Sequence, residues 1–111
     1  MAIFFKTGAP SHLLDAYKQA IDAGHIDTWS CDSDGDFTHT VSQWNREAWL
    51  RPKVIDDSTL AFFILGRKEK SLSVTTYAVY HGRFIESMLA HCDGLFSEAH
   101  ATALPVNGDN I

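Results

Sequence analysis

The chain has 111 residues, of which 45% are hydrophobic and 12% aromatic, and its formal charge is −5 at pH 7. This length and composition are typical of one globular domain with a core, which excludes intrinsic disorder for the body of the chain. The acidic balance excludes bulk nucleic-acid binding, because a phosphate-backbone binder needs a basic stripe, and no apolar run approaches the roughly 18 residues of a membrane span. We therefore expect a single cytoplasmic domain over residues 1–111 that does not bind membranes.

Metal and redox motifs are absent from the sequence. Cys31 and Cys92 lie far apart and without Cys-x-x-Cys spacing, which predicts buried structural thiols. His81 and His91 fall on different sides of a helix, so they do not match a helical metal site. The acidic run at residues 32–36 lacks the glycine and the last carboxylate of a calcium loop at the required positions. We interpret it as a hairpin turn and expect no metal and no cofactor.

The first part of the chain predicts a strand and a helix. Residues 2–6 are apolar and rich in Phe, and a turn-forming Thr-Gly-Ala-Pro sequence follows them. Ser11 is the candidate N-cap of the helix, and Gly24 is its stop signal. A spacing of three and four residues predicts that the helix buries one apolar face, made of Leu13, Leu14, Tyr17 and Ile21.

A hairpin and a short helix are expected next. Residues 26–31 alternate as a strand, the following Asp-Gly supplies the positive φ of a tight turn, and residues 37–39 begin the returning strand. Thr40 and Gln43 match a capping box, in which each side chain bonds to the backbone of the other residue. This pattern predicts a short helix over residues 41–46.

Two further strands follow in the chain. Residues 48–55 look extended, and Pro52 marks an edge strand or an irregularity there. Residues 59–65 are the most apolar run, which suits a central strand covered on both faces. Residues 66–72 are polar, and we interpret them as a loop.

The longest predicted element is an amphipathic helix over residues 74–92 that starts near Ser73. Its apolar spacing predicts core positions at Phe84, Ile85, Met88 and Leu89. Residues 95–104 alternate as a final strand, although their alanines would equally support a helix. Residues 105–111 are expected to be a mobile tail.

The resulting order β-α-β-β-β-β-α-β predicts an α+β fold. Two helices with one apolar face each, and strands joined by short turns, favour a mostly antiparallel sheet that both helices cover on one face. Without the middle hairpin, the order is that of ferredoxin-like folds. A ferredoxin-like domain with an inserted hairpin is therefore our interpretation.

The segment from residue 44 to residue 51 is the candidate contact surface. It contains two aromatic and two guanidinium side chains, the types enriched at binding hot spots: Trp44, Arg46, Trp49 and Arg51. The alternative is a cluster that packs inside one subunit, with Arg stacked on Trp. If the first interpretation holds, the segment binds a protein partner or a second copy of the chain.

A second candidate set combines polar residues from the long helix and the last strand, namely His81, Arg83, Glu98 and His100. Between the first two lies Gly82, which costs about 1 kcal/mol in a helix relative to alanine. It either permits tight packing on the sheet or lets a strand, a partner or a ligand approach closely. Glu98 and His100 share one face of their strand, as an acid–base pair or as a plain polar face.

No motif in the sequence names a reaction. Nucleophile-elbow, phosphate-loop and dinucleotide-binding patterns are absent. We therefore expect a small non-enzymatic protein-interaction or regulatory module. The alternatives are a small enzyme or a small-molecule-binding domain that uses the second candidate set. An enclosed pocket with converging polar groups would favour those alternatives, whereas an exposed aromatic–arginine patch would favour the interaction module.

Overall fold

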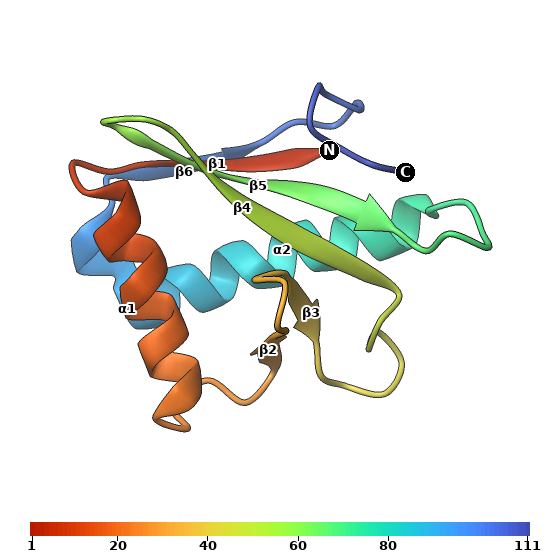
Figure 1. Ribbon diagram of the computed structural model, residues 1–111, viewed down its shortest axis with the longest axis horizontal. Coiled ribbons are helices and arrows are strands. Elements are labelled where there is room, and N and C mark those ends of the chain that lie inside the picture. The colour runs from red at the N-terminus through yellow and green to blue at the C-terminus, as the bar shows by residue number, and fades with distance from the viewer.

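The computed structural model describes residues 1–111 as an α+β fold, which confirms the predicted fold class. Its antiparallel sheet has the order β2-β3-β4-β5-β1-β6 (Figure 1). Neither α-helix combines the length and the hydropathy that a membrane-spanning segment requires. The elements in chain order are β1 (Ala2–Lys6), α1 (Pro10–Asp22), β2 (Trp29–Cys31), β3 (Phe37–His39), β4 (Ala48–Asp56), β5 (Thr59–Gly66), α2 (Val74–Cys92), a 3-10 turn (Asp93–Leu95) and β6 (Glu98–Ala101).

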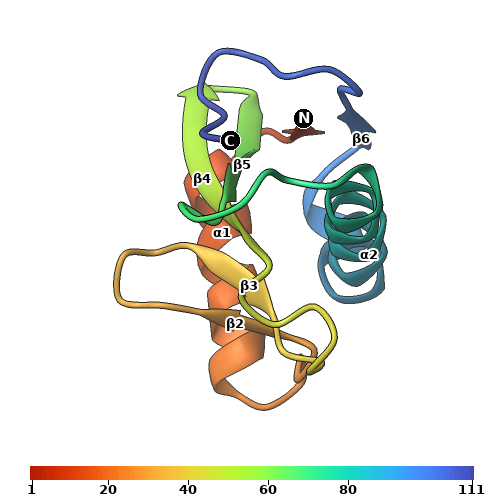
Figure 2. The ribbon, with the colours of Figure 1, turned by 90° about the vertical axis from the view of Figure 1, so that its right-hand side faces the viewer.

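Both helices cover the same face of the sheet, and an aromatic core lies between the two layers (Figures 1 and 2). Phe84 of α2 stands at the centre of this core, with its ring 4.6 Å from that of Phe62 and 5.1 Å from that of Tyr17. The Tyr17 hydroxyl bonds to the Ser87 hydroxyl at 2.8 Å and ties the two helices together. Burial raises the pKa of Tyr17, so this phenol stays neutral.

In each half of the chain, a helix joins two strands that hold a third strand between them. Helix α1 connects β1 to the β2–β3 hairpin and β4, while β5 lies between β1 and β4. Helix α2 connects β5 to β6, and β1 lies between them. The ferredoxin-like relationship stays an interpretation of this order. The β2–β3 hairpin extends the sheet beyond β4, as Figure 2 shows.

The short helix predicted over residues 41–46 is absent, and a series of turns replaces it. The Thr40 hydroxyl donates to the Asp27 carbonyl at 2.6 Å, so the expected capping box does not form. Arg46 then adopts a left-handed conformation with φ 59°, which ends the turn and starts β4. Two predicted strands are longer than the strands that the structure contains. The strand predicted over residues 26–31 corresponds to the shorter β2, and the strand predicted over residues 95–104 corresponds to the shorter β6.

The prediction that Leu89 is a core residue is wrong, because its side chain is 51% exposed. The buried stripe of α2 is centred on Phe84. At about 100° per residue, Leu89 lies roughly 140° around the helix from Phe84. Hydrophobic spacing identified the correct helix but could not separate its buried face from an exposed apolar flank. Leu13, Tyr17, Phe84 and Met88 are fully buried, and Leu14, Ile21 and Ile85 are partly buried against them.

The segment 105–111, expected to be a mobile tail, lies across the face of the sheet that the helices leave open (Figure 2). The Asp109 carboxylate is only 2% exposed, and it accepts hydrogen bonds from the Ile64 and Val106 backbone N–H groups at 3.1 and 2.9 Å. Gly108 packs against the Phe63 ring so closely that an added Cβ would lie 2.7 Å from it. The tail therefore covers part of β5.

Pro52 lies in the second half of β4, which has a neighbouring strand on one side only. Strand β3 pairs with β4 only at Phe37 and Leu50, so beyond this point β4 bonds to β5 alone. A proline is tolerated there because its missing N–H would otherwise face solvent. Strand β5 is buried along most of its length and pairs with β4 and β1, which confirms it as a central strand.

Candidate functional site

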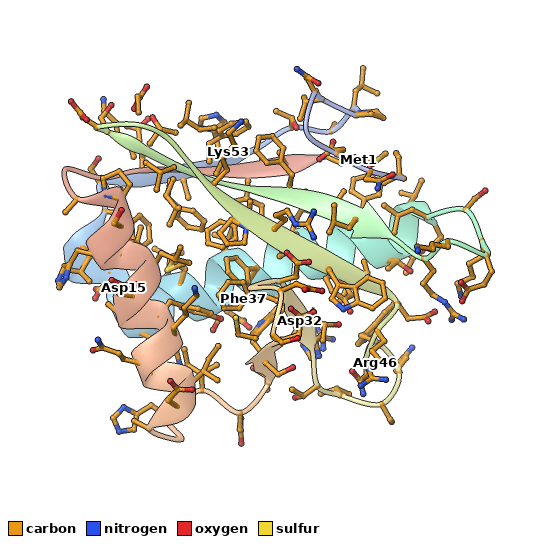
Figure 3. The ribbon with its side chains drawn as sticks, viewed as in Figure 1. Met1, Asp15, Asp32, Phe37, Arg46 and Lys53 are labelled. Carbon is orange, nitrogen blue, oxygen red and sulfur yellow. The ribbon has the colours of Figure 1, made fainter.

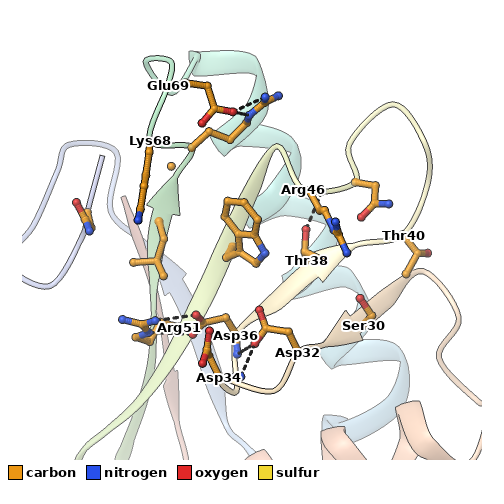
Figure 4. Close-up of a pocket in the computed structure, with 16 residues that line it drawn as sticks. Ser30, Asp32, Asp34, Asp36, Thr38, Thr40, Arg46, Arg51, Lys68 and Glu69 are labelled. Atoms are coloured by element: carbon orange, nitrogen blue, oxygen red, sulfur yellow. Dashed lines mark hydrogen bonds and ion pairs between the residues drawn. The ribbon is translucent and has the colours of Figure 1, made fainter.

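A groove of about 980 Å³ lies on the open face of the sheet, between the β2–β3 hairpin, β4 and the loop after β5 (Figure 4). Trp49 and Leu65 are its only apolar residues, and they lie among four acidic and four basic side chains. Figure 4 shows Arg46 and Thr40 on the hairpin side and Lys68 and Glu69 on the opposite side. The charged residues are Asp32, Asp34, Asp36, Glu69, Arg46, Arg51, Arg67 and Lys68.

An ion pair between the buried Asp36 carboxylate and the exposed Arg51 guanidinium lines one part of the groove. The Asp36 carboxylate is 6% exposed, and the Arg51 guanidinium donates to it through two nitrogens, at 2.9 and 2.8 Å. The hydrogen bonds and charge of Asp36 raise the pKa of Arg51 further. The two hydrogen bonds join the β2–β3 hairpin to β4 and so fix the position of the hairpin on this side of the groove.

The turn carboxylates have internal uses. Asp32 Oδ1 accepts the backbone N–H groups of Asp34 and Asp36, at 2.9 and 3.0 Å, which shapes the hairpin turn. The three carboxylates at positions 32, 34 and 36 lie within 4.8 Å of one another. Since Asp36 already binds Arg51, the arrangement agrees with a hairpin turn carrying acidic side chains.

Charges near the loop after β5 fall into two groups. Glu47 bonds to Lys70 at 2.8 Å and to Arg67 at 2.9 Å, and these two partners lower the pKa of Glu47. Arg67 also pairs with Glu69. In contrast, Arg46 and Lys68 are exposed and have no ion-pair partner within 4 Å. These two cations are therefore available to a bound group.

The structure brings three of the four residues of the predicted contact surface together. Arg46, Trp49 and Arg51 line the groove. Trp44 packs against the main core on the helix side of the sheet, and its carbonyl accepts a hydrogen bond from the Tyr80 hydroxyl. The interpretation of internal packing thus describes Trp44, whereas the groove contains the half-buried Trp49 and the exposed Arg46 and Arg51.

The second candidate set does not converge on one point. His81 is buried on α2, while Arg83 on the same helix is exposed. Ala99 of β6 packs against the core, so Glu98 and His100 on either side of it project onto the open face. There the His100 ring stacks on Phe4 at 5.1 Å. The sheet therefore separates Glu98 and His100 from His81.

His81 is nevertheless unusual, because its Nε2 atom is buried without a hydrogen-bond partner. Its Nδ1 atom lies 2.6 Å from the Tyr77 carbonyl, the Met1 backbone lies beside the ring, and the charges of the N-terminal ammonium and of Asp109 act on the imidazole. Burial is the main effect, and it lowers the pKa of His81. Burial likewise lowers the pKa of His39, and the charge of Arg83 adds to this effect.

These two lowered pKa values predict acid sensitivity. Both imidazoles bind a proton less readily in the folded state than in the unfolded state, so the unfolded state takes up more protons and stability falls as pH drops below about 6.5. Urea unfolding between about pH 8 and pH 5 should show this slope, and His81→Gln should make it shallower. The same change at His12, which is exposed, is the control. An unchanged slope in His81→Gln would contradict the assignment.

Sequence reasoning did not identify Lys68 as part of the groove, and it did not identify the Asp36–Arg51 ion pair. Lys68 follows β5, and Asp36 closes the hairpin turn, so they are 32 residues apart in the chain. Only the pairing of β3 with β4 and of β4 with β5 brings both segments beside Trp49. The only signal for this lysine in the sequence is the run of charged residues 67–70 within the predicted polar loop.

Comparisons with known proteins add no assignment to this geometry. No family model matches the chain, and neither the curated proteins nor the solved structures contain a match.

Proposed function

We propose that the protein is a non-enzymatic interaction module whose groove binds a segment of a partner protein. The observation that carries this proposal is that the half-buried Trp49 lines the same groove as the exposed, unpaired cations Arg46 and Lys68. Trp and Arg are the residue types most enriched at binding hot spots. The Asp36–Arg51 ion pair in the same groove fixes two of the lining side chains, which reduces the entropy lost on binding.

The shape and lining of the groove support a protein partner over a small molecule. Small-molecule sites are usually enclosed and mainly apolar. Here the groove is open and its lining is mostly polar, and a second cavity, near Glu47 and Leu72, has a volume of only about 110 Å³. Four acidic and four basic residues line the groove, a balance that also disfavours a polyanion such as nucleic acid.

The charge distribution favours a partner segment that carries both signs. Arg46 and Lys68 suit an acidic side chain, and the exposed Asp32 and Asp34 at the hairpin turn suit a basic one. The Trp49 ring, which lines the same groove, offers a flat apolar contact. Such complementary charges contribute more to specificity and association rate than to affinity.

A random peptide library displayed on phage tests the proposal. We expect enrichment of mixed-charge peptides whose binding changes the tryptophan fluorescence of the protein, and Arg46→Glu or Lys68→Glu should each weaken binding about tenfold, or about 1.4 kcal/mol. Lys53→Glu makes the same charge change on β4, away from Arg46 (Figure 3), and should bind as the parent does. The proposal fails if no peptide is enriched, or if Lys53→Glu weakens binding as much as Arg46→Glu.

A further inference from the structure

Strand β6 presents an unpaired edge whose backbone is free to bond to another strand. The Thr7 N–H bonds to the Ser58 carbonyl, and the Thr102 N–H bonds to the Ala2 carbonyl. Bonding directions alternate along an antiparallel strand, so even-numbered residues of β6 bond to β1. The N–H and C=O groups of Ala99 and Ala101 therefore point away from the sheet.

This edge is self-complementary. If a second β6 pairs antiparallel about a two-fold axis at His100, Ala99 lies opposite the partner's Ala101 and both outward-pointing residues bond fully. A two-fold axis at Ser97 would pair more residues, but it would require the Ser97 N–H to bond to the partner strand. This N–H already donates to the Lys6 carbonyl of its own subunit. In the His100-centred register, Glu98 lies diagonal to the partner's His100, which places an acidic group beside an imidazole.

Helix α2 has an exposed apolar flank on the same side of the molecule. Ser87 faces α1 through its bond to Tyr17, and His81 lies on the other side of the buried stripe, beside Met1. At about 100° per residue, the flank lies beyond His81 on the helix surface, on the side of the buried stripe that faces away from α1. Its members are Val74, Ala78, Gly82, Ile85 and Leu89, of which Val74 is 70% and Leu89 51% exposed.

Gly82 lies near the level of the centre of β6. His81 is beside Met1, Phe84 is 6.3 Å from Phe5, and His100 pairs with Phe4 between those two residues. A Cβ added at Gly82 would meet no atom within 4 Å, so packing within the subunit does not require this glycine. Small residues at a helix surface let a second helix approach closely.

We infer that the chain forms a two-fold symmetric dimer in which β6 pairs with the β6 of a second copy and the flanks of α2 pack together beneath it. Figure 2 shows β6 and α2 at the same border of the molecule, opposite the β4 side. The dimer explains both the exposed Leu89 and the glycine in α2. It leaves the groove on a separate surface.

Sedimentation of point variants tests this dimer. The parent should sediment as a dimer at micromolar concentration. Gly82→Arg should be monomeric because the arginine blocks the helix contact, and Ala101→Pro should be monomeric because it removes an outward-pointing N–H without removing a bond to β1. Both should keep the parent's circular dichroism spectrum. Ala90→Arg, an equal change at an exposed position outside the flank, should remain dimeric.

Disulfide trapping tests the register. In a Cys31→Ser background, His100→Cys should cross-link across the axis, because directly opposed residues of a non-hydrogen-bonded pair have Cα atoms about 4.5 Å apart. Glu98→Cys should not cross-link, because it faces the partner's Thr102. A monomeric parent, a dimeric Gly82→Arg and Ala101→Pro, or cross-linking through Glu98→Cys instead would overturn the inference. The Arg46→Glu variant should remain a dimer, because Arg46 lies in the groove and not at β6. If this variant were monomeric, the result would place the dimer interface at the groove instead.

Discussion

Phe84→Ala is expected to lower the free energy of unfolding by about 3–5 kcal/mol, the range for truncating a buried aromatic side chain. Phe84 is fully buried, and its ring contacts residues from α1, β1, β2, β3 and β5. Its removal would leave a cavity at the point where both helices meet the sheet. Urea unfolding monitored by circular dichroism measures the change.

Leu89→Ala, on the same helix, is the matched control and should cost less than about 1 kcal/mol. Both variants should be made on the Ala101→Pro background, so that the measurement reports the single subunit rather than its association. A loss at Leu89 as large as the loss at Phe84 would contradict the placement of the buried stripe.

Arg51→Met should lower the free energy of unfolding by about 2 kcal/mol. The substitution leaves the Asp36 carboxylate buried without its cation, and such a loss costs about 3–5 kcal/mol in a fully buried pair. The expected cost is smaller here because the Arg51 side chain is 55% exposed and water can replace part of the interaction.

A double-mutant cycle with Asp36→Asn isolates this interaction. Once the carboxylate is neutral, Arg51→Met should cost much less, because no buried charge loses its partner. Arg46→Met supplies the control, since Arg46 has no ion-pair partner and its removal should hardly change stability. An equal cost of Arg51→Met with Asp36 and with Asn at this position would show that the pair does not stabilise the fold.

The groove and the β6 edge would give the protein two separate binding surfaces. A dimer through β6 places the two grooves on distant parts of the assembly, because the groove lies at the β2–β4 side of the sheet. Two copies of a partner segment within one molecule could then bind both grooves, and linked binding of this kind raises avidity without new contacts.

The sequence by itself determined the elements whose signals are local. Apolar spacing located both helices, Ser73 capped α2 by accepting the Thr76 N–H as its position suggested, and Asp-Gly formed the hairpin turn. The apolar run that became β5 was also identified as the central strand. These features depend on side-chain periodicity and on backbone preferences within a few residues, so the chain carries them without tertiary information.

Only the tertiary structure decided which side of each element is exposed and which distant residues meet. Leu89 has the spacing of a core residue, yet its side chain is exposed. The sheet buries the face of α2 that includes Phe84 and His81, and Leu89 lies outside this face. Thr40 has the sequence of a helix cap, but the Asp27 carbonyl bonds its hydroxyl. The groove depends on strand pairing between distant segments, and such pairing is set by the free energy of the whole fold rather than by any local pattern.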